Sequence, residues 1–336
     1  MILAGGLSTR LYPLTKAVPK PLVPVAGVPN AAHLIRYLKS YGFDEIAINL
    51  HYLADAIVAT LGDGSRFGVR LHYSYEPELL GSAGGVKKIE EYFGDDDFIV
   101  IGCDEVTDLR LDDILEFHRD RQATATIGLV QCEDVEQYGV VVLDERGKIV
   151  GFQEKPAKGT ELSNLANTGV YFFSPEIFAR IPANEFYDFG KQVFPALQTA
   201  GEPFYGFEAR SAYWADIGTP SEYRRASYDV LRGVITIPGT PATGVDPSAK
   251  IGSEVRIEGP VRLCAGARVG DGVTIVGPAI VGERAAVEPG ARLERAILWE
   301  GAQIGAGADL RDTVVGANYV VSPGAKIDNA LVATDE

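Results

Sequence analysis

Hydrophobic and polar positions follow two different patterns along the chain. Up to about residue 235, short apolar runs alternate with stretches in which apolar residues recur every three to four positions. The runs predict buried strands, and the stretches predict amphipathic helices. We expect strands at 2–4, 46–50, 69–75, 98–101 and 124–131, with helices at 30–41, 52–61, 82–92 and 111–121. This alternation predicts an α/β fold with a Rossmann-like, mostly parallel sheet built by right-handed crossovers.

One segment of this first region breaks the alternation. Residues 138–154 contain two strand-like runs on either side of Asp144-Glu145-Arg146-Gly147. A polar, glycine-containing turn between two such runs predicts a β-hairpin. The sheet is therefore expected to be mixed.

From about residue 245 the apolar period changes to six. Apolar residues occupy every sixth position from Val245 to Trp299, and two five-residue steps then give Ile304, Leu310, Val315, Val321 and Ile327. Small residues stand between them, as the corners of a tight coil require. This pattern predicts a left-handed parallel β-helix of hexapeptide repeats. We therefore expect a domain at 1–233, a proline- and glycine-rich linker at 234–244, and a β-helix at 245–332.

Composition narrows the classes of function. The 336 residues carry a net charge of −15, which disfavours a nucleic-acid binder. No apolar run approaches the length of roughly 20 residues that spans a bilayer, and no secretory signal precedes the first motif. The three scattered cysteines favour a reducing cytoplasm. The first strand is so short that we expect a few further residues ahead of Met1.

A glycine loop near the N-terminus provides the first candidate chemistry. Gly5 and Gly6 follow the first strand, and adjacent glycines let backbone N–H groups turn toward a phosphate. Residues 1–43 contain no acid, and Arg10 and Lys20 add positive charge near this loop. Neither a Walker loop nor a dinucleotide fingerprint is present. The loop is therefore expected to bind an anionic ligand of another kind.

Seven motifs in order extend this picture. The segment 3–24, LAGGLSTRLYPLTKAVPKPLVP, resembles the signature of the sugar-1-phosphate nucleotidyltransferases. Later segments resemble motifs of the same family, and the resemblance covers residues 1–230. They are Glu76 with Leu80-Gly81-Ser82-Ala83-Gly84, Asp104-Glu105-Val106-Thr107-Asp108, Tyr138-Gly139-Val140, Glu154-Lys155-Pro156, Asn167-Thr168-Gly169-Val170-Tyr171 and Trp214-Ala215-Asp216-Ile217-Gly218-Thr219.

The resemblance implies an enzyme that joins a nucleoside triphosphate to a sugar 1-phosphate and releases pyrophosphate. It implies that Mg²⁺ is the cofactor, held by Asp104 and Asp216. The catalytic residues would be Arg10, Lys20, Asp104, Lys155 and Asp216. The nucleotide would contact Leu3, Ala4, Gly5, Gly6, Thr9, Arg10, Lys20, Glu76, Gly81 and Ser82. The sugar phosphate would contact Gly139, Glu154, Lys155, Asn167 and Tyr171.

Structural roles compete with several of these assignments. Asp104 could be a helix N-cap, and Lys155 could form an ion pair with Glu154 at the end of the hairpin. Tyr171 could simply pack in the core, and Glu76 could be a solvated strand end.

Substrate choice and activity are less constrained by the motifs. Segments 80–84 and 21–27 are most similar to those of mannose-1-phosphate guanylyltransferases, which favours GTP and mannose 1-phosphate. UTP or dTTP with glucose 1-phosphate, and other sugar or cyclitol phosphates, stay open. Ser8 and Cys103 depart from the family pattern, so a regulatory subunit that binds a sugar nucleotide without turnover is a further alternative.

The β-helix raises the question of a second activity. Many such helices are acyltransferases with a histidine base, but all four histidines here precede residue 119. We therefore expect a structural role, either assembly of a homo-oligomer (a dimer or a tetramer) or packing on the catalytic domain. Trp299 is expected either at a subunit contact or in the β-helix core.

Overall fold

The computed structural model describes residues 1–334, which pack as two compact units. The first unit comprises Met1–Gly6 and Leu38–Trp214, and the second comprises Leu7–Tyr37 and, of the described residues, 215–334. Contacts thus group the segment after the glycine loop with the C-terminal part of the chain. The boundary expected between residues 233 and 234 stays a prediction.

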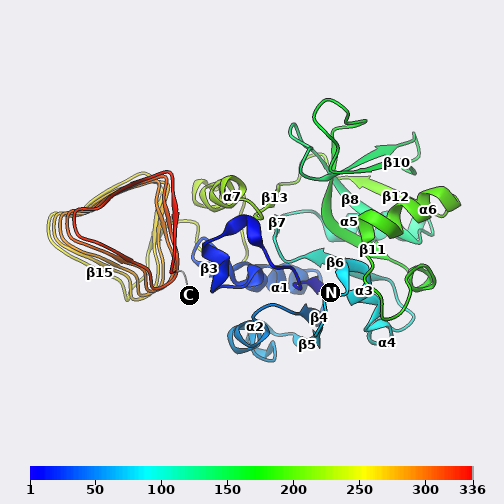
Figure 1. The fold of residues 1–336 in the computed structure, drawn as a ribbon, viewed down its shortest axis with the longest axis horizontal. Coiled ribbons are helices and arrows are strands. Elements are labelled where there is room, and N and C mark those ends of the chain that lie inside the picture. The colour runs from blue at the N-terminus through cyan, green and yellow to red at the C-terminus, as the bar shows by residue number, and fades with distance from the viewer. Residues whose placement is uncertain (335–336) are drawn as a thin grey trace. The chain divides into compact units, whose positions relative to one another are not determined.

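The first unit is built on a nine-stranded mixed sheet (Figure 1). The central strand β1 pairs in parallel with β4 and β6, while β11 runs antiparallel to β6. The predicted Rossmann-like mixed sheet is confirmed, and the hairpin lies at one edge, in β9 and β10. The strands are β1 (Ile2–Leu3), β4 (Glu45–Leu50), β5 (Arg70–Tyr75), β6 (Phe98–Gly102), β8 (Ala125–Gln131), β9 (Gly139–Leu143), β10 (Ile149–Glu154), β11 (Leu165–Phe173) and β12 (Phe204–Glu208).

Helices and short strands complete the part of the chain before the β-helix. The helix expected at 82–92 is two short helices, because Ile89 leaves helical geometry at φ −116° and ψ 31°. The α-helices are α1 (Asn30–Ser40), α2 (Ala54–Leu61), α3 (Gly81–Lys87), α4 (Glu90–Phe93), α5 (Leu111–Asp120), α6 (Phe194–Ala200) and α7 (Pro220–Arg232). The remaining strands are β2 (Pro24–Val25), β3 (Val28–Pro29), β7 (Glu105–Thr107) and β13 (Trp214–Asp216). The 3₁₀-helices are η1 (Thr9–Leu11), η2 (Leu14–Lys16), η3 (Lys20–Leu22), η4 (Ser65–Phe67) and η5 (Pro175–Arg180), and η6 (Phe189–Val193) is a π-helix.

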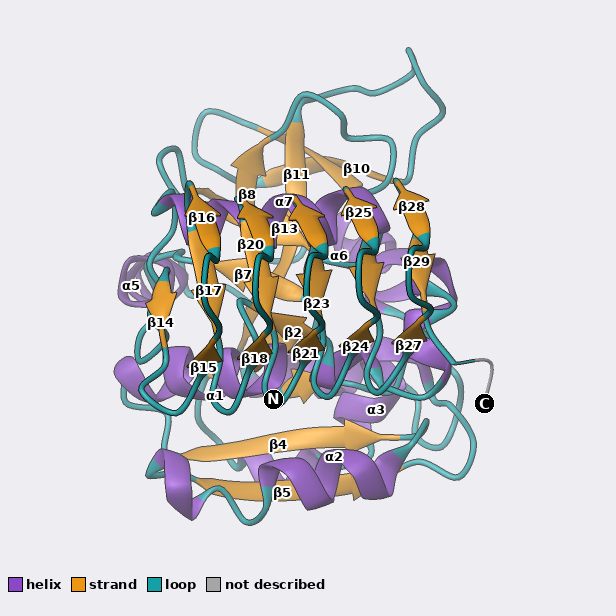
Figure 2. Cartoon of the chain, turned by 90° about the vertical axis from the view of Figure 1, so that its left-hand side faces the viewer, coloured by secondary structure: helices purple, strands orange, loops and turns teal. Residues whose placement is uncertain are grey.

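The second unit contains the predicted left-handed β-helix, whose triangular cross-section is visible in Figure 1. Three parallel sheets form its faces, and their stacked strands are seen in Figure 2. The first sheet contains β14 (Gly244–Val245), β17 (Val261–Leu263), β20 (Ala279–Val281), β23 (Ile297–Leu298), β26 (Val314–Val315) and β29 (Leu331–Val332). The second contains β15 (Lys250–Ile251), β18 (Arg268–Val269), β21 (Ala286–Val287), β24 (Gln303–Ile304) and β27 (Val320–Val321). The third contains β16 (Arg256–Glu258), β19 (Thr274–Val276), β22 (Arg292–Glu294), β25 (Asp309–Arg311) and β28 (Lys326–Asp328).

The expected repeat position of Trp299 is wrong by one residue. Leu298 pairs with Val281 and belongs to the apolar core of the β-helix, so the first five-residue step ends at Leu298. The cause is a shortened corner, where the single left-handed residue Arg295 (φ 48°) replaces the Gly277-Pro278 pair of the preceding coil. Trp299 is nevertheless buried, because it packs on α7.

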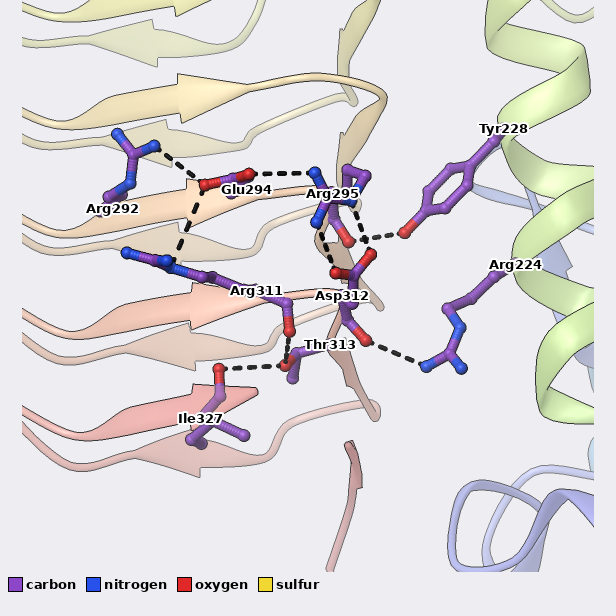
Figure 3. Close-up of polar contacts among 9 residues, drawn as sticks. All are labelled: Arg224, Tyr228, Arg292, Glu294, Arg295, Arg311, Asp312, Thr313 and Ile327. Atoms are coloured by element: carbon purple, nitrogen blue, oxygen red, sulfur yellow. Dashed lines mark hydrogen bonds and ion pairs between the residues drawn. The ribbon is translucent and has the colours of Figure 1, made fainter. Parts of the chain in front are cut away.

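The shortened corner is also where α7 attaches to the β-helix (Figure 3). Tyr228 donates to the Arg295 carbonyl, and Arg224 donates to the Asp312 carbonyl at 2.9 Å. Asp312 is a second left-handed corner residue, and its carboxylate receives two hydrogen bonds from the Arg295 guanidinium. The backbone carbonyls at these two left-handed corners therefore accept hydrogen bonds from side chains on α7.

A buried histidine in the second unit gives a pH-dependent stability. Nε2 of His33 lies 2.9 Å from the Val25 carbonyl, and burial lowers the pKa of His33 to about 4 from an ordinary 6.5. Between these values the unfolded chain binds a proton that the folded chain does not, so stability is lost as pH falls from about 6.5 to about 4. We expect this histidine to account for on the order of 3 kcal/mol of that loss.

Chemical denaturation at pH 7 and pH 4.5 measures the effect. His33→Gln should flatten the pH dependence, whereas His72→Gln, at an exposed residue whose ring stacks on Tyr92, should leave it unchanged. If the stability of His33→Gln depends on pH as steeply as that of wild type, the effect belongs to other groups.

Candidate active site

The glycine loop is anchored by a buried chain of hydrogen bonds in the first unit. Ala4 donates its backbone N–H to Asn49 Oδ1 at 2.8 Å, and Asn49 Nδ2 donates to Glu76 Oε1 at 2.9 Å. The other Glu76 oxygen accepts from the Leu80 backbone at 3.0 Å. Glu76 is fully buried, so its side chain joins the glycine loop to the segment that begins at Leu80. A direct contact of Glu76 with a nucleotide base stays a prediction.

The segment Gly81-Ser82 is tied to a loop that lies a hundred residues further along the chain. Ser82 Oγ donates to Asp188 Oδ2 and accepts from the Phe189 backbone, both at 2.9 Å. Gly81 has φ +76°, and a Cβ there would lie 2.5 Å from the Tyr187 carbonyl. Only glycine therefore allows this close approach.

Gly81→Ala is expected to lower the free energy of unfolding by about 2–4 kcal/mol, through left-handed backbone strain and overpacking. Because Ser82 would shift with it, we also expect the KM for the nucleotide to rise severalfold. Gly201→Ala is the matched control, since Gly201 has φ +69° with nothing within 4 Å of its Cβ position. It should cost about 1–2 kcal/mol and leave KM unchanged; equal effects of both variants would contradict the role of the Tyr187 contact. Denaturation curves and steady-state kinetics measure both quantities.

The residues expected to contact the sugar phosphate converge at one end of β9, β10 and β11. Gly139 pairs with Glu154 across the hairpin, and a Cβ on Gly139 would lie 3.3 Å from Glu154 Oε2 and 3.4 Å from Asn167 Cβ. Asn167 Nδ2 donates to the Tyr171 hydroxyl at 3.1 Å. Burial raises the pKa of Tyr171, so its hydroxyl stays neutral. Four of the five predicted residues therefore form one cluster.

Lys155, the fifth, follows directly at the end of β10. Its backbone is left-handed at φ 49°, and its side chain is exposed. Non-glycine residues in this conformation are strained and are concentrated at functional sites. The strained backbone sets the direction in which the ammonium group leaves the strand.

Two further charged residues near this cluster, Asp188 and Lys191, were not identified by the sequence analysis. Asp188 caps the π-helix η6 by accepting from the backbone of Gly190 and Lys191. A Cβ on Gly190 would lie 2.7 Å from Glu154 Oε2. Partial desolvation and the nearby Asp188 raise the pKa of Glu154, and the charges of Lys155 and Lys191 oppose that rise. The run Asp188-Phe189-Gly190-Lys191, in which an acid and a base lie on either side of Phe189 and Gly190, was the available signal.

Asp104 lies beside the glycine loop. Strand β6 ends at Gly102, and the Cys103 backbone donates to the Leu3 carbonyl at 3.0 Å, so Asp104 follows at the same sheet edge. Cys103 is buried and forms no disulfide. Next to Asp104, the buried Glu105 accepts from Trp214 Nε1 at 2.6 Å, a contact that the sequence did not reveal.

The register of the sheet places these groups along one edge. Leu3 pairs with Gly102, Val170 pairs with Ile101, and Ala166 pairs with Val140. The carboxyl ends of β1, β6 and β10 and the amino ends of β9 and β11 therefore coincide. Ligands of open α/β sheets bind at such an edge.

The second unit contains the other predicted residues. Arg10 Nη2 lies 3.7 Å from Asp216 Oδ2, and Asp216 Oδ1 accepts from the Gly218 backbone at 2.7 Å. Thr9 begins η1 and Lys20 begins η3, both in the segment that follows the loop. Ser8 adopts a left-handed conformation (φ 52°), which is where a glycine would be favoured.

The two aspartates expected to hold the metal lie in different units. Asp104 belongs to the first unit and Asp216 to the second. Within residues 1–334, no group of three or more His, Cys, Asp or Glu is arranged to hold a metal ion. In the same residues, no helix is both long and apolar enough to cross a bilayer.

Comparisons with known proteins agree on one family. The family model described as nucleotidyl transferase matches residues 1–233. A UTP–glucose-1-phosphate uridylyltransferase of Synechocystis sp. is 39% identical, over 100% of this chain and 92% of the relative. A mannose-1-phosphate guanylyltransferase of Mycobacterium tuberculosis is 32% identical, over 91% of this chain and 81% of the relative. The crystal structure of HddC from Yersinia pseudotuberculosis has a TM-score of 0.59 at 30% identity, over 67% of this chain and 96% of that one.

Proposed function

Because this chain belongs to the nucleotidyl transferase family, among its sugar-1-phosphate nucleotidyltransferases, we propose that it joins GTP to mannose 1-phosphate, giving GDP-mannose and pyrophosphate. The observation that carries this proposal is the shared sheet edge. It holds the glycine loop and Asp104 on β1 and β6, and Gly139, Glu154 and Asn167 on the adjacent strands. A triphosphate and a sugar phosphate need two such subsites side by side.

The chemistry requires positive charge more than a protein nucleophile. The sugar phosphate oxygen attacks the α-phosphorus, and each pair of unit charges about 4 Å apart repels by roughly 4 kcal/mol at an effective dielectric constant near 20. In the proposal, Lys20 holds the α-phosphate, Arg10 the leaving pyrophosphate and Lys155 the incoming sugar phosphate. A phosphate monoester is already mostly dianionic at neutral pH, so no strong base is needed.

Mg²⁺ is the proposed cofactor. Asp104 and Asp216 supply carboxylate oxygens, the hard donors that Mg²⁺ prefers, and substrate phosphates and water normally complete its shell. A donor set of only two carboxylates fits a metal that binds together with its substrate. When bound, Mg²⁺ would neutralise charge on the reacting phosphates.

UTP with glucose 1-phosphate is the second candidate. It is favoured by the uridylyltransferase relative, which is 39% identical across the whole chain. The guanylyltransferase assignment rests instead on residues 80–84 and 21–27 and on several relatives that carry that name. The three cysteines form no disulfide, which fits a cytoplasmic location, and this location is part of the proposal.

Pyrophosphate release tests the proposal. The purified protein is incubated with Mg²⁺ and each of GTP, UTP, dTTP, ATP and CTP, against mannose 1-phosphate and glucose 1-phosphate. Release that is fastest with GTP and mannose 1-phosphate supports the assignment, whereas release that is fastest with UTP and glucose 1-phosphate replaces it by the second candidate. Tight binding of a sugar nucleotide without release in any pair would overturn the enzyme assignment in favour of a regulatory subunit.

A further inference from the structure

The first coil of the β-helix leaves its apolar interior uncovered. Its three inward-pointing residues, Val245, Ile251 and Ile257, are 49%, 43% and 41% exposed. One coil further along, the equivalent residues Leu263, Val269 and Ile275 are at most 3% exposed. Each sheet of the triangle therefore ends in one apolar side chain that stays partly exposed among the described residues.

The opposite end of the β-helix differs. Val321 is only 2% exposed there, and Ile327 and Val332 are half-buried. Solenoid proteins need a polar cap on their terminal repeats to remain soluble. The first coil lacks such a cap, which makes it a binding surface for another apolar end.

The backbone of the first coil also has an open hydrogen-bonding edge. Gly252 donates to the Val269 carbonyl and Arg256 donates to the Val273 carbonyl, so both face the second coil. In a strand, neighbouring residues direct their N–H and C=O groups to opposite sides. The backbone groups of Val245, Ile251 and Ile257 therefore point outward, on the terminal strands β14, β15 and β16. An open edge of this kind pairs readily with another strand.

We propose that the first coil is the interface of a homodimer, in which two chains stack their β-helices through the same end about a two-fold axis. A two-fold places the first coil of one chain on the first coil of its partner and closes the assembly. Stacking of this end on the opposite end of another chain would instead grow an open fibre. The covered Val321 end offers less apolar surface for that arrangement.

Charge complementarity selects which strand lies on the axis. A two-fold through β16 makes this strand pair antiparallel with its own copy, centred on Ile257. Arg256 then faces Glu258 of the partner subunit, and the reverse pair forms as well. Both side chains are exposed and form no ion pair within residues 1–334.

The same axis aligns the other two faces. Strand β14 then lies antiparallel to β15 of the second copy, with Val245 opposite the residue equivalent to Ile251. This register brings Asp246 opposite the copy of Lys250, again twice by symmetry. The β16 axis therefore gives four pairs of opposite charge. An axis through β14 or β15 gives only two pairs of opposite charge. In those arrangements Gly244 or Gly252 lies opposite each of the other charged residues.

Sedimentation velocity on the full chain with charge reversals tests the axis. Wild type is expected to be a dimer at micromolar concentration. R256E should raise the dissociation constant at least about tenfold, because it makes two favourable pairs repulsive, and R256E/E258R should restore it. R268E, on an exposed arginine one coil away in the sheet that contains Lys250, is the matched control and should dissociate like wild type. A monomeric wild type at 100 µM, or no effect of R256E, would overturn the proposal.

Disulfide cross-linking gives a second measurement that does not depend on dissociation. Directly opposed residues in a hydrogen-bonded antiparallel pair have Cα atoms about 5.5 Å apart, within the range that a disulfide spans. I257C should therefore yield a covalent dimer under mild oxidation, as should V245C/I251C, whereas I251C alone should not. Dimers from I251C but not I257C would reject the β16 axis. Ladders of higher oligomers would show open stacking instead of a closed dimer.

Discussion

Asp104→Asn is expected to lower kcat by about a hundred- to a thousandfold while the protein keeps its fold. The amide preserves the shape of the side chain but removes the negative charge at the end of β6, where the proposal places the metal. Activity should not be recovered by raising the GTP concentration, because the lost interaction acts on the reacting phosphates. Steady-state kinetics across a Mg²⁺ titration, with thermal unfolding of the same samples, measures both effects.

The matched control makes the same chemical change at a surface ion pair. Asp113→Asn removes the partner of Arg110 on α5, where both side chains are exposed. It should change stability by less than about 1 kcal/mol and leave kcat unaffected. A kcat for Asp104→Asn within threefold of wild type would remove Asp104 from the proposed metal site.

Tyr223→Phe is expected to lower the free energy of unfolding by about 2–5 kcal/mol and to raise the KM for the nucleotide about tenfold. The fully buried Tyr223 hydroxyl donates to the Pro24 carbonyl and accepts from Trp299 Nε1, both at 2.8 Å. Removing this hydroxyl leaves both the Pro24 carbonyl and the Trp299 indole N–H without their hydrogen-bond partner. Pro24 follows Lys20 by four residues, so the segment that carries this lysine loses one of its links to the β-helix.

Two variants separate anchoring from general destabilisation. Trp299→Phe removes the donor and part of a buried ring but keeps the hydrogen bond from Tyr223 to Pro24, so it should destabilise the protein and change KM less than Tyr223→Phe does. Tyr228→Phe removes a hydroxyl on the same helix whose partner is the Arg295 carbonyl, away from the segment 7–37. It should destabilise the protein without changing KM. A KM that rises equally in Tyr228→Phe would show that the effect follows stability alone.

This prediction gives the β-helix a role inside the chain as well as between chains. Besides Tyr223, the segment 7–37 contacts the β-helix through Leu14, whose Cδ2 would lie 3.3 Å from a Cβ on Gly316. A Cβ on Gly27 would lie 2.5 Å from Cys264 Sγ. Arg10 and Lys20, which are proposed to bind the triphosphate, therefore lie on a segment that packs against the β-helix.

The amino-acid sequence by itself determined the features that depend on neighbouring positions. The alternation of apolar runs and helical patterns is local, and it predicted the mixed α/β sheet. The six-residue period predicted the β-helix, because one inward residue per face is a property of each coil. The ordered motifs identified the family and most of the residues at the sheet edge, since loops at strand ends carry their chemistry in consecutive residues.

The tertiary structure alone decided what depends on contacts between distant residues. Glu76 is an anchor of the glycine loop because Asn49 meets it from another strand, and Asp188 joins the site because Ser82 reaches it. Trp299 leaves the repeat position because one corner is a residue shorter, which no apolar period records. The support of Lys20 by the β-helix likewise rests on the Trp299 and Tyr223 side chains, 76 residues apart in sequence. Such contacts arise from packing, and local sequence patterns do not encode them.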